Sequence, residues 1–179
     1  MGGGLGMLVG ASHRVVTESS RIAMPEISIG LFPDVGASYF LNKMPDACGL
    51  FLTGTSINAA DAKYCELADY FIEQQYKDQL ISQLRSVNWG DTIPLNHDKL
   101  SSLLKEFEQT SISKQPVSLI REHQPLIAKF IEKGSLPDIV QAIVNEESED
   151  KWLNRAQKSL KNGSALSANL AYTKGLELY

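Results

Sequence analysis

The sequence predicts an α/β chain in which a short α/β part, up to about residue 72, is followed by a wholly helical region over residues 73–179. In the first part, short apolar segments bounded by polar turns and glycines alternate with helical patterns. From residue 74 onward, apolar residues recur at helical spacing, and polar turns such as 88–91 and 161–163 separate the helices. We find no internal repeat in either part.

In the first part, local signals place the ends of several expected helices. Pro45 ends one helix and Asp46 caps the next, while Asn58 is a good N-cap for a third. The expected elements are helices over 5–12, 37–43, 46–52 and 59–67, strands over 13–16, 21–24 and 68–72, and a loop over 28–36. In the second part, helices are expected at about 74–86, 98–109, 117–133, 136–147, 148–161 and 165–178.

The composition is that of an ordinary globular protein and excludes several function classes. Of the 179 residues, 43% are hydrophobic and 21% charged, with a formal net charge of -4. This charge, without a basic stripe of interleaved aromatics, predicts no nucleic-acid partner. No apolar run approaches the ~20 residues that span a bilayer, so we expect no membrane association. No basic segment with a following apolar core opens the sequence, and we expect a cytoplasmic location.

The cysteines and histidines do not indicate a metal or redox centre. Cys48 and Cys65 lack the spacing of a zinc site or a redox pair, and we interpret them as small buried hydrophobes in a reducing compartment. His13, His97 and His123 show no shared face and no metal-ligand spacing, so we expect solvated or structural roles. We therefore predict no metal site.

The most informative stretch is MPEISIGLFPDVG, which spans residues 24–36 and carries two carboxylates, Glu26 and Asp34. An acidic side chain in such an apolar segment is costly unless it is paired, hydrogen-bonded or used for chemistry. Pro25 fixes its own φ and restricts the residue before it, so Glu26 should be rigidly held. Two structural alternatives stay open. Glu26 could accept a backbone N–H, and Asp34 could cap the helix that follows it.

A triple glycine, Gly2-Gly3-Gly4, stands at the start of the sequence before an apolar stretch. Such a turn can deliver bare backbone N–H groups to a helix N-terminus, where they suit a developing oxyanion. The alternative is a flexible start of the chain. Together with two buried carboxylates, an oxyanion donor indicates acyl or enolate chemistry.

Taken together, these motifs resemble the crotonase (enoyl-CoA hydratase/isomerase) superfamily, and within it they are most similar to the branch of 3-hydroxyisobutyryl-CoA hydrolases. The resemblance covers roughly residues 1–72, and its order and spacing are specific although each motif alone is weak. It implies a partial crotonase-type spiral of ββα units over 1–72, followed by an all-helical C-terminal region. The motifs are Gly2-Gly3-Gly4 with Gly6, Met24-Pro25-Glu26 with residues 29–36, and Leu52-Thr53-Gly54 with residues 57–62.

The resemblance implies roles for individual residues. Gly3 would donate an oxyanion-hole N–H to the thioester carbonyl, and Glu26 matches the catalytic glutamate of the family. Asp34 stands where hydratases usually carry glycine and the hydrolase branch carries aspartate. Gly6 stands where hydratases place a second catalytic glutamate, which argues against two-carboxylate hydration. The substrate-binding residues that the resemblance implies are Gly2, Gly4, Gly30 and Phe32.

The implied reaction is hydrolysis of a short 3-hydroxyacyl-CoA thioester, such as 3-hydroxyisobutyryl-CoA in valine catabolism. Coenzyme A would be part of the substrate, and we expect no separate cofactor. The alternatives are a hydratase or isomerase of the same fold and a catalytically silent CoA-binding or assembly module. Because the other oxyanion donor and most of the CoA pocket belong to a part of the family that precedes these motifs, we expect an internal or C-terminal fragment, inactive when isolated. A homo-oligomer stays open.

Overall fold

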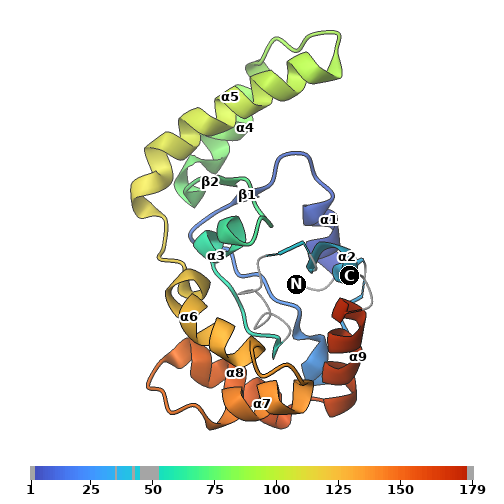
Figure 1. The fold of residues 1–179 in the computed structure, drawn as a ribbon. Helices are drawn as coiled ribbons and strands as arrows, with labels where there is room; N and C mark the ends of the chain where they lie inside the picture. The colour runs from blue at the N-terminus through green and yellow to red at the C-terminus, as the bar shows by residue number, and fades with distance from the viewer. Residues whose placement is uncertain (1–2, 35, 42, 45–52, 177–179) are drawn as a thin grey trace.

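The computed structural model describes residues 3–34, 36–41, 43–44 and 53–176, and its described elements are mainly helices (Figure 1). The first part contains α1 (Gly3–Val9), β1 (Val15–Val16), the 3-10 helix η1 (Pro25–Ile29), α2 (Ala37–Leu41), α3 (Ala59–Tyr64) and β2 (Tyr70–Phe71). The elements that follow are η3 (Gln74–Tyr76), α4 (Lys77–Ser86), α5 (Ile93–Ser111), η4 (Ile112–Lys114), α6 (Leu119–Ile131), α7 (Leu136–Asn145), α8 (Lys151–Asn162) and α9 (Ala165–Leu176).

The strands are shorter than predicted, and their partners are distant in the sequence. β1 pairs with β2 in parallel, with Val15 opposite Tyr70 and Val16 opposite Phe71. The predicted strand over 21–24 is reduced to one antiparallel bridge between Ile22 and Ile57. A turn at 17–20, closed by the Ser20 N–H on the Thr17 carbonyl oxygen (2.9 Å), separates the two segments. Each segment therefore pairs with a later part of the chain, and neither pairs with the other.

Most of the predicted helices are present, with shifted ends. Asn58 caps α3 as predicted: its side chain accepts the Asp61 N–H (3.0 Å), and the Asp61 carboxylate accepts the Asn58 N–H (3.1 Å). The predicted helix over 98–109 begins earlier, at Ile93, because a proline in its first turn suits a helix start. The predicted helix over 46–52 lies outside the described residues.

One hydrophobic core joins the α/β part to the later helices. Its buried members include Met24 and Phe71 from the first part and Ile127 and Leu153 from α6 and α8. A smaller cluster forms around Ile72 together with two α5 residues, Leu104 and Phe107. The main core thus extends across the boundary that we place at residues 72 and 73, and the division into two domains there stays a prediction.

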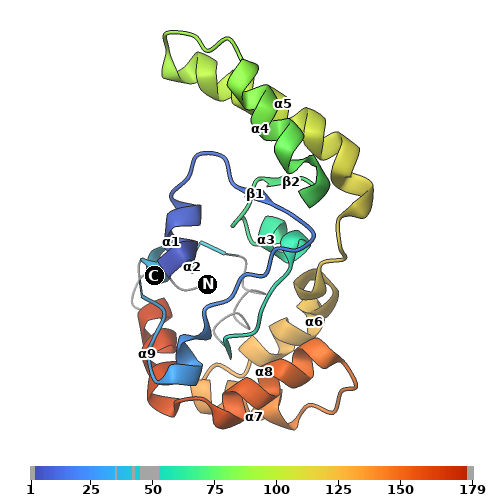
Figure 2. The ribbon, with the colours of Figure 1, turned by 180° about the vertical axis from the view of Figure 1, so that it is seen from behind.

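The pair α4–α5 extends away from the other helices, as both views show (Figure 1; Figure 2). A hydrogen-bonded ion pair holds its base, where Glu108 of α5 binds Lys63 of α3 and also accepts the Phe71 N–H of β2 (2.8 Å). Near β1 and β2, the Arg14 guanidinium hydrogen-bonds the Asp69 carboxylate, which lowers the pKa of Asp69 below its usual value.

A buried carboxylate joins α3 to the start of α6. Asp61 is 0% exposed, and besides its part in the α3 cap it accepts the Ser118 hydroxyl (2.8 Å) and the Ile120 N–H (2.9 Å). These donors lie in the first turn of α6 and at its N-cap. A buried charge is tolerated when its lone pairs are filled in this way, so Asp61 fixes the position of α6 on the α/β part.

We expect Asp61→Ala to lower the free energy of unfolding by about 3 kcal/mol, because it leaves buried donors without an acceptor. Urea denaturation measures this value. The matched control is Asp98→Ala on the exposed side of α5, where the change should stay within about 0.5 kcal/mol. A similar small effect for both variants would contradict the structural role of Asp61.

Candidate functional site

The segment that carries Glu26 is a short 3-10 helix with a proline at its start and a glycine at its end. Pro25 occupies its first turn, and Gly30 ends it with φ 74° and ψ 16°. Glycine is suited to this left-handed conformation because it has no Cβ. The N–H groups of Gly30 and Leu31 both donate to the Glu26 carbonyl oxygen, the latter at 3.0 Å. The backbone of Glu26 is therefore fixed by its own turn.

The Glu26 carboxylate is buried and incompletely satisfied. The residue is 7% exposed, and its Oε2 atom finds no hydrogen-bond partner among the described residues. A buried carboxylate oxygen without a donor is costly and calls for an explanation. One explanation is that this oxygen binds a water molecule or a substrate. The alternative, that Glu26 caps a backbone N–H through this atom, finds no support within the described ranges.

Asp34 lies on the exposed loop between η1 and α2. Its carbonyl oxygen accepts the Ala37 N–H at the start of α2 (2.8 Å), so its backbone takes part in the entry to this helix. The side chains of Glu26 and Asp34 form no hydrogen bond with each other, although both residues belong to the described part. The structure thus gives the two carboxylates different surroundings, one buried and one exposed.

Apolar side chains are exposed between the two carboxylates. Ile29 is 69% exposed, Leu31 is 55% and Phe32 is 42%. Two further exposed apolar residues, Met7 of α1 and Tyr39 of α2, belong to the helices that both views show next to each other. Of these residues, Ile29, Leu31 and Phe32 follow Glu26 directly in the chain, and exposed apolar residues of this kind are common at binding surfaces.

The first residues of α1 are the remaining predicted site residues. Gly3 and Gly4 open this helix and are exposed, and the N–H groups of a first helical turn have no partner within the helix. Gly2 lies outside the described residues. α2 contacts α9, and α9 also contacts η1, so α9 lies beside both the helix that carries Glu26 and the helix that follows Asp34.

The sequence did not predict two segments that pack against η1, at Gly54 and at Gly163. Ile27 packs between Gly54 and Gly163, and the Ser164 N–H donates to the Ile27 carbonyl oxygen (3.0 Å). Gly54 belongs to a motif of the resemblance, but its packing role does not follow from the motif. For residues 161–163 the available signal was the Asn-Gly pair, which predicts a turn without indicating what the turn contacts.

Trp152 attaches α8 to the segment before α3, and His123 of α6 stacks on it. The Trp152 Nε1–H donates to the Ser56 carbonyl oxygen (3.2 Å), and the His123 ring stacks on Trp152 at 5.5 Å. Asp150 caps α8 by accepting two backbone N–H groups, each at 2.8 Å. Burial raises the pKa of Asp150, but these N–H groups and the nearby His123 outweigh it, and the pKa lies below its usual value.

The histidines and cysteines correct two interpretations of the sequence. His13 and His97 do share a site: their rings meet edge to face at 5.2 Å, and His13 Nε2 hydrogen-bonds the Ser101 hydroxyl (2.9 Å). Within the described ranges, no group of three or more His, Cys, Asp and Glu side chains could hold a metal ion. Cys65 is buried as predicted and is disulfide-bonded, which the sequence analysis did not predict. Cys48 lies outside the described residues.

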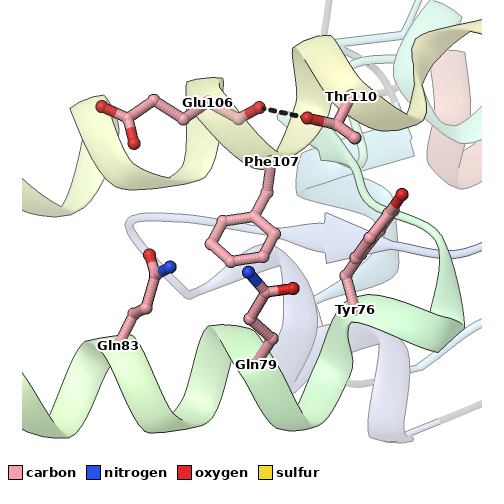
Figure 3. A pocket seen from close by; sticks show the side chains of 6 residues that line it. All are labelled: Tyr76, Gln79, Gln83, Glu106, Phe107 and Thr110. Atoms are coloured by element: carbon pink, nitrogen blue, oxygen red, sulfur yellow. Dashed lines mark hydrogen bonds between the residues drawn. The ribbon is translucent and has the colours of Figure 1, made fainter.

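A pocket of about 190 Å³ lies between α4 and α5 (Figure 3). In Figure 3 the Phe107 ring of α5 points toward two glutamine side chains of α4 and toward Tyr76 at the end of η3. No residue that the sequence predicts for the site lines this pocket, whose lining residues are Tyr76, Gln79, Gln83, Glu106, Phe107 and Thr110.

Among the described helices, none combines the length and the hydropathy that a membrane crossing requires.

Comparison with known proteins identifies the family and the fold of the chain. The family model for enoyl-CoA hydratase/isomerase matches residues 1–176. The chain therefore belongs to the enoyl-CoA hydratase/isomerase family, and its fold is a partial crotonase-type spiral followed by a helical region, as predicted. A carnitinyl-CoA dehydratase from Mycobacterium thermoresistibile has a similar structure, with a TM-score of 0.78 and 24% identity over 99% of this chain and 48% of that one.

The chain is also similar to curated proteins that are named as hydrolases. 3-hydroxyisobutyryl-CoA hydrolase 1 of Arabidopsis thaliana is 32% identical over 175 residues, which cover 96% of this chain and 44% of the relative. The mitochondrial 3-hydroxyisobutyryl-CoA hydrolase of Danio rerio is 32% identical over 154 residues, which cover 83% of this chain and 38% of the relative. The chain thus spans less than half the length of these relatives.

Proposed function

We propose that the protein hydrolyses a short 3-hydroxyacyl-CoA thioester, with 3-hydroxyisobutyryl-CoA of valine catabolism as the preferred substrate. The observation that carries this proposal is the buried Glu26 carboxylate, whose Oε2 atom has no partner among the described residues. Membership of the enoyl-CoA hydratase/isomerase family supports an acyl-CoA substrate. The names of the curated relatives support thioester hydrolysis.

In the proposed reaction, backbone N–H groups, including that of Gly3, polarise the thioester carbonyl. The loss of one such donor typically costs ~3 kcal/mol of transition-state stabilisation. As a general base, Glu26 takes a proton from water while the water oxygen adds to the carbonyl carbon. The tetrahedral intermediate then collapses, the carbon–sulfur bond breaks, and the thiolate of coenzyme A takes up the proton. As a nucleophile, the Glu26 carboxylate would instead add to the carbonyl carbon, the carbon–sulfur bond would break, and the thiolate of coenzyme A would leave. Water would then open the mixed anhydride to give the free hydroxy acid and the original Glu26 carboxylate, with the released proton taken up by the thiolate.

The proposed substrate contacts come before and after Glu26 in the sequence. Gly30 and Phe32 follow it on the exposed apolar loop, and Gly2 and Gly4 flank the donor Gly3. Asp34 would position the water, bind the substrate hydroxyl or assist Glu26. Because Gly6 replaces the second glutamate of hydratases, hydrolysis is favoured over hydration. We propose that coenzyme A enters only as part of the substrate, with no separate cofactor or metal.

A hydratase or isomerase of the same fold is the second candidate, which the description of the matching family favours. A silent CoA-binding or assembly module is the third. A cytoplasmic location and a homo-oligomer stay predictions. The compartment needs a direct test, because the names of several relatives include the mitochondrion.

We expect the full-length protein to release free thiol from 3-hydroxyisobutyryl-CoA, measured with a thiol reagent, at the same rate with and without a chelator. Addition of water to crotonyl-CoA without thiol release would identify a hydratase. Binding of coenzyme A with neither reaction would identify a silent module. A rate that falls on metal removal and returns with the metal would contradict the proposed independence from metal.

We expect Glu26→Gln to lower kcat for thiol release by ~10²-fold or more, the scale of a general acid–base contribution. The amide keeps the size of the side chain but cannot take the proton, so binding of the CoA ester, measured by calorimetry, should be retained. Nearly full activity of the variant would remove Glu26 from the reaction.

We expect Asp34→Gly to abolish most of the hydrolysis, with a loss of about tenfold or more in kcat and no loss of folding. Glycine is the residue that hydratases usually carry at this position, and the exposed loop tolerates it. If Asp34 acts only as a helix cap, Asp34→Asn should keep nearly all activity, and Asp34→Ala should lose about 1 kcal/mol of stability. Kinetics and thermal denaturation of the three variants separate these roles.

A further inference from the structure

We propose that the turn between α8 and α9, at Gly163 and Ser164, positions Glu26 for the reaction. It does so by holding the neighbouring residue, Ile27, in place. The inference rests on the proposed role of Glu26 as the reacting carboxylate. It assigns a function in the reaction to a segment of the helical region that lies far from the catalytic motif in the sequence.

The first argument concerns what orients the carboxylate. Because Glu26 Oε2 receives no hydrogen bond from the described residues, hydrogen bonds at this atom cannot fix its direction. Its place is then set by the backbone of η1 and by the packing of the neighbouring side chain, Ile27, which is 5% exposed. Whatever holds Ile27 therefore also holds Glu26.

The second argument is the close approach of the α8–α9 turn to Ile27. A Cβ at Gly163 would lie 2.8 Å from Ile27 Cγ1 and 2.8 Å from the Ser159 carbonyl oxygen, closer than real side chains come. The neighbouring Ser164 N–H donates to the Ile27 carbonyl oxygen (3.0 Å). The turn thus holds both the side chain and the backbone of Ile27.

The turn is itself fixed by the helices on either side. The Ser164 hydroxyl accepts the Ser167 N–H (3.1 Å), and its carbonyl oxygen accepts the Ala168 N–H (3.0 Å), so Ser164 caps α9. A displacement of this residue would disturb the first turn of that helix. The contacts that Gly163 and Ser164 make with Ile27 are therefore stabilised by the N-terminus of α9.

The third argument is a matching contact on the opposite side of Ile27. Gly54 has φ 77°, and a Cβ there would lie 3.3 Å from both Ile27 Cγ2 and Pro25 Cα. The two sides are joined, since the Ser159 hydroxyl of α8 donates to the Thr53 carbonyl oxygen. Ile27 is therefore held between two glycines on segments that are hydrogen-bonded to each other.

Such a grip matters because a general base acts over a narrow range of positions. A misplacement of about 1 Å can cost ~10²-fold in rate, and catalytic groups work best on rigid supports. A change at the turn should therefore lower the rate of the chemical step more than it weakens binding of the CoA ester, because proton transfer is more sensitive to a small displacement than the contacts proposed at Gly30 and Phe32.

The test compares Gly163→Ala with Asn162→Ala in the full-length protein. Asn162 is the exposed neighbour in the same turn and serves as the matched control. We expect Gly163→Ala to lower kcat by about tenfold or more with KM within about twofold, and Asn162→Ala to change neither. Ile27→Val, which shortens the gripped side chain by one methyl group, should lower kcat by about threefold and keeps the test open if Gly163→Ala fails to fold. Unchanged kcat in both Gly163→Ala and Ile27→Val would overturn the proposal.

A double-mutant cycle separates positioning from a general structural effect. In the Glu26→Gln background, Gly163→Ala should lower the residual kcat by less than twofold, because there is no longer a base to misplace. An equal loss in both backgrounds would show that Gly163 acts independently of Glu26 and would overturn the proposal.

Amide hydrogen exchange distinguishes a failure of this inference from a failure of the proposed function. The amides of Gly30 and Leu31 close η1 on the Glu26 carbonyl oxygen, and Gly163→Ala should make them exchange about tenfold faster, with no such change in Asn162→Ala. If the protein releases no thiol but this exchange becomes faster, the turn does hold η1 through Ile27, and the proposed reaction is wrong. If the exchange is unchanged, the turn does not hold η1, whatever the reaction is.

Discussion

The buried carboxylate of Asp61 is the constraint on which the arrangement of the two parts depends. It completes the cap of α3 and accepts two donors at the start of α6, so it fixes where the chain returns to the α/β part after the α4–α5 pair. From α6 the chain continues through α7 to α8, which contacts α7 and η1. Trp152 ties α8 to the Ser56 carbonyl oxygen, and the end of α8 then reaches Ile27. The proposed positioning of Glu26 thus depends on a series of contacts that begins at the N-terminus of α6.

Regular strand pairing contributes little to this scaffold. In the part of the chain that the structure describes, β1 and β2 pair in parallel over two residues each, and Ile22 and Ile57 form an isolated bridge. Two-residue strands leave few ladder hydrogen bonds to hold the chain, so stability here comes from side-chain burial and from hydrogen bonds between side chains and backbone. This explains why the later helices contribute to the main core and to the support of η1, rather than forming a separate layer.

The features that the sequence predicted correctly depend on neighbouring residues. Pro25 and Gly30 delimit η1, and Asn58 with Asp61 forms a capping box, because each signal acts within one turn of chain. The features that it missed depend on residues far apart. Nothing local in residues 13–16 indicates a partner at 70–71, and an Asn-Gly turn does not reveal which side chain fills the space of its missing Cβ. The meeting of His13 and His97 has the same origin, since the path of the chain brings them together.

A comparison with three other carboxylates of the described chain supports the role that we propose for Glu26. Asp61 has its lone pairs occupied by buried donors, and Asp69 is bound to the Arg14 guanidinium, which lowers its pKa. Asp150 accepts two backbone N–H groups and likewise has a lowered pKa. The oxygens of these three carboxylates are engaged by donors that belong to the fold itself. Glu26 is buried without such donors at Oε2, so its position comes from packing, and that oxygen stays available to water or to a thioester.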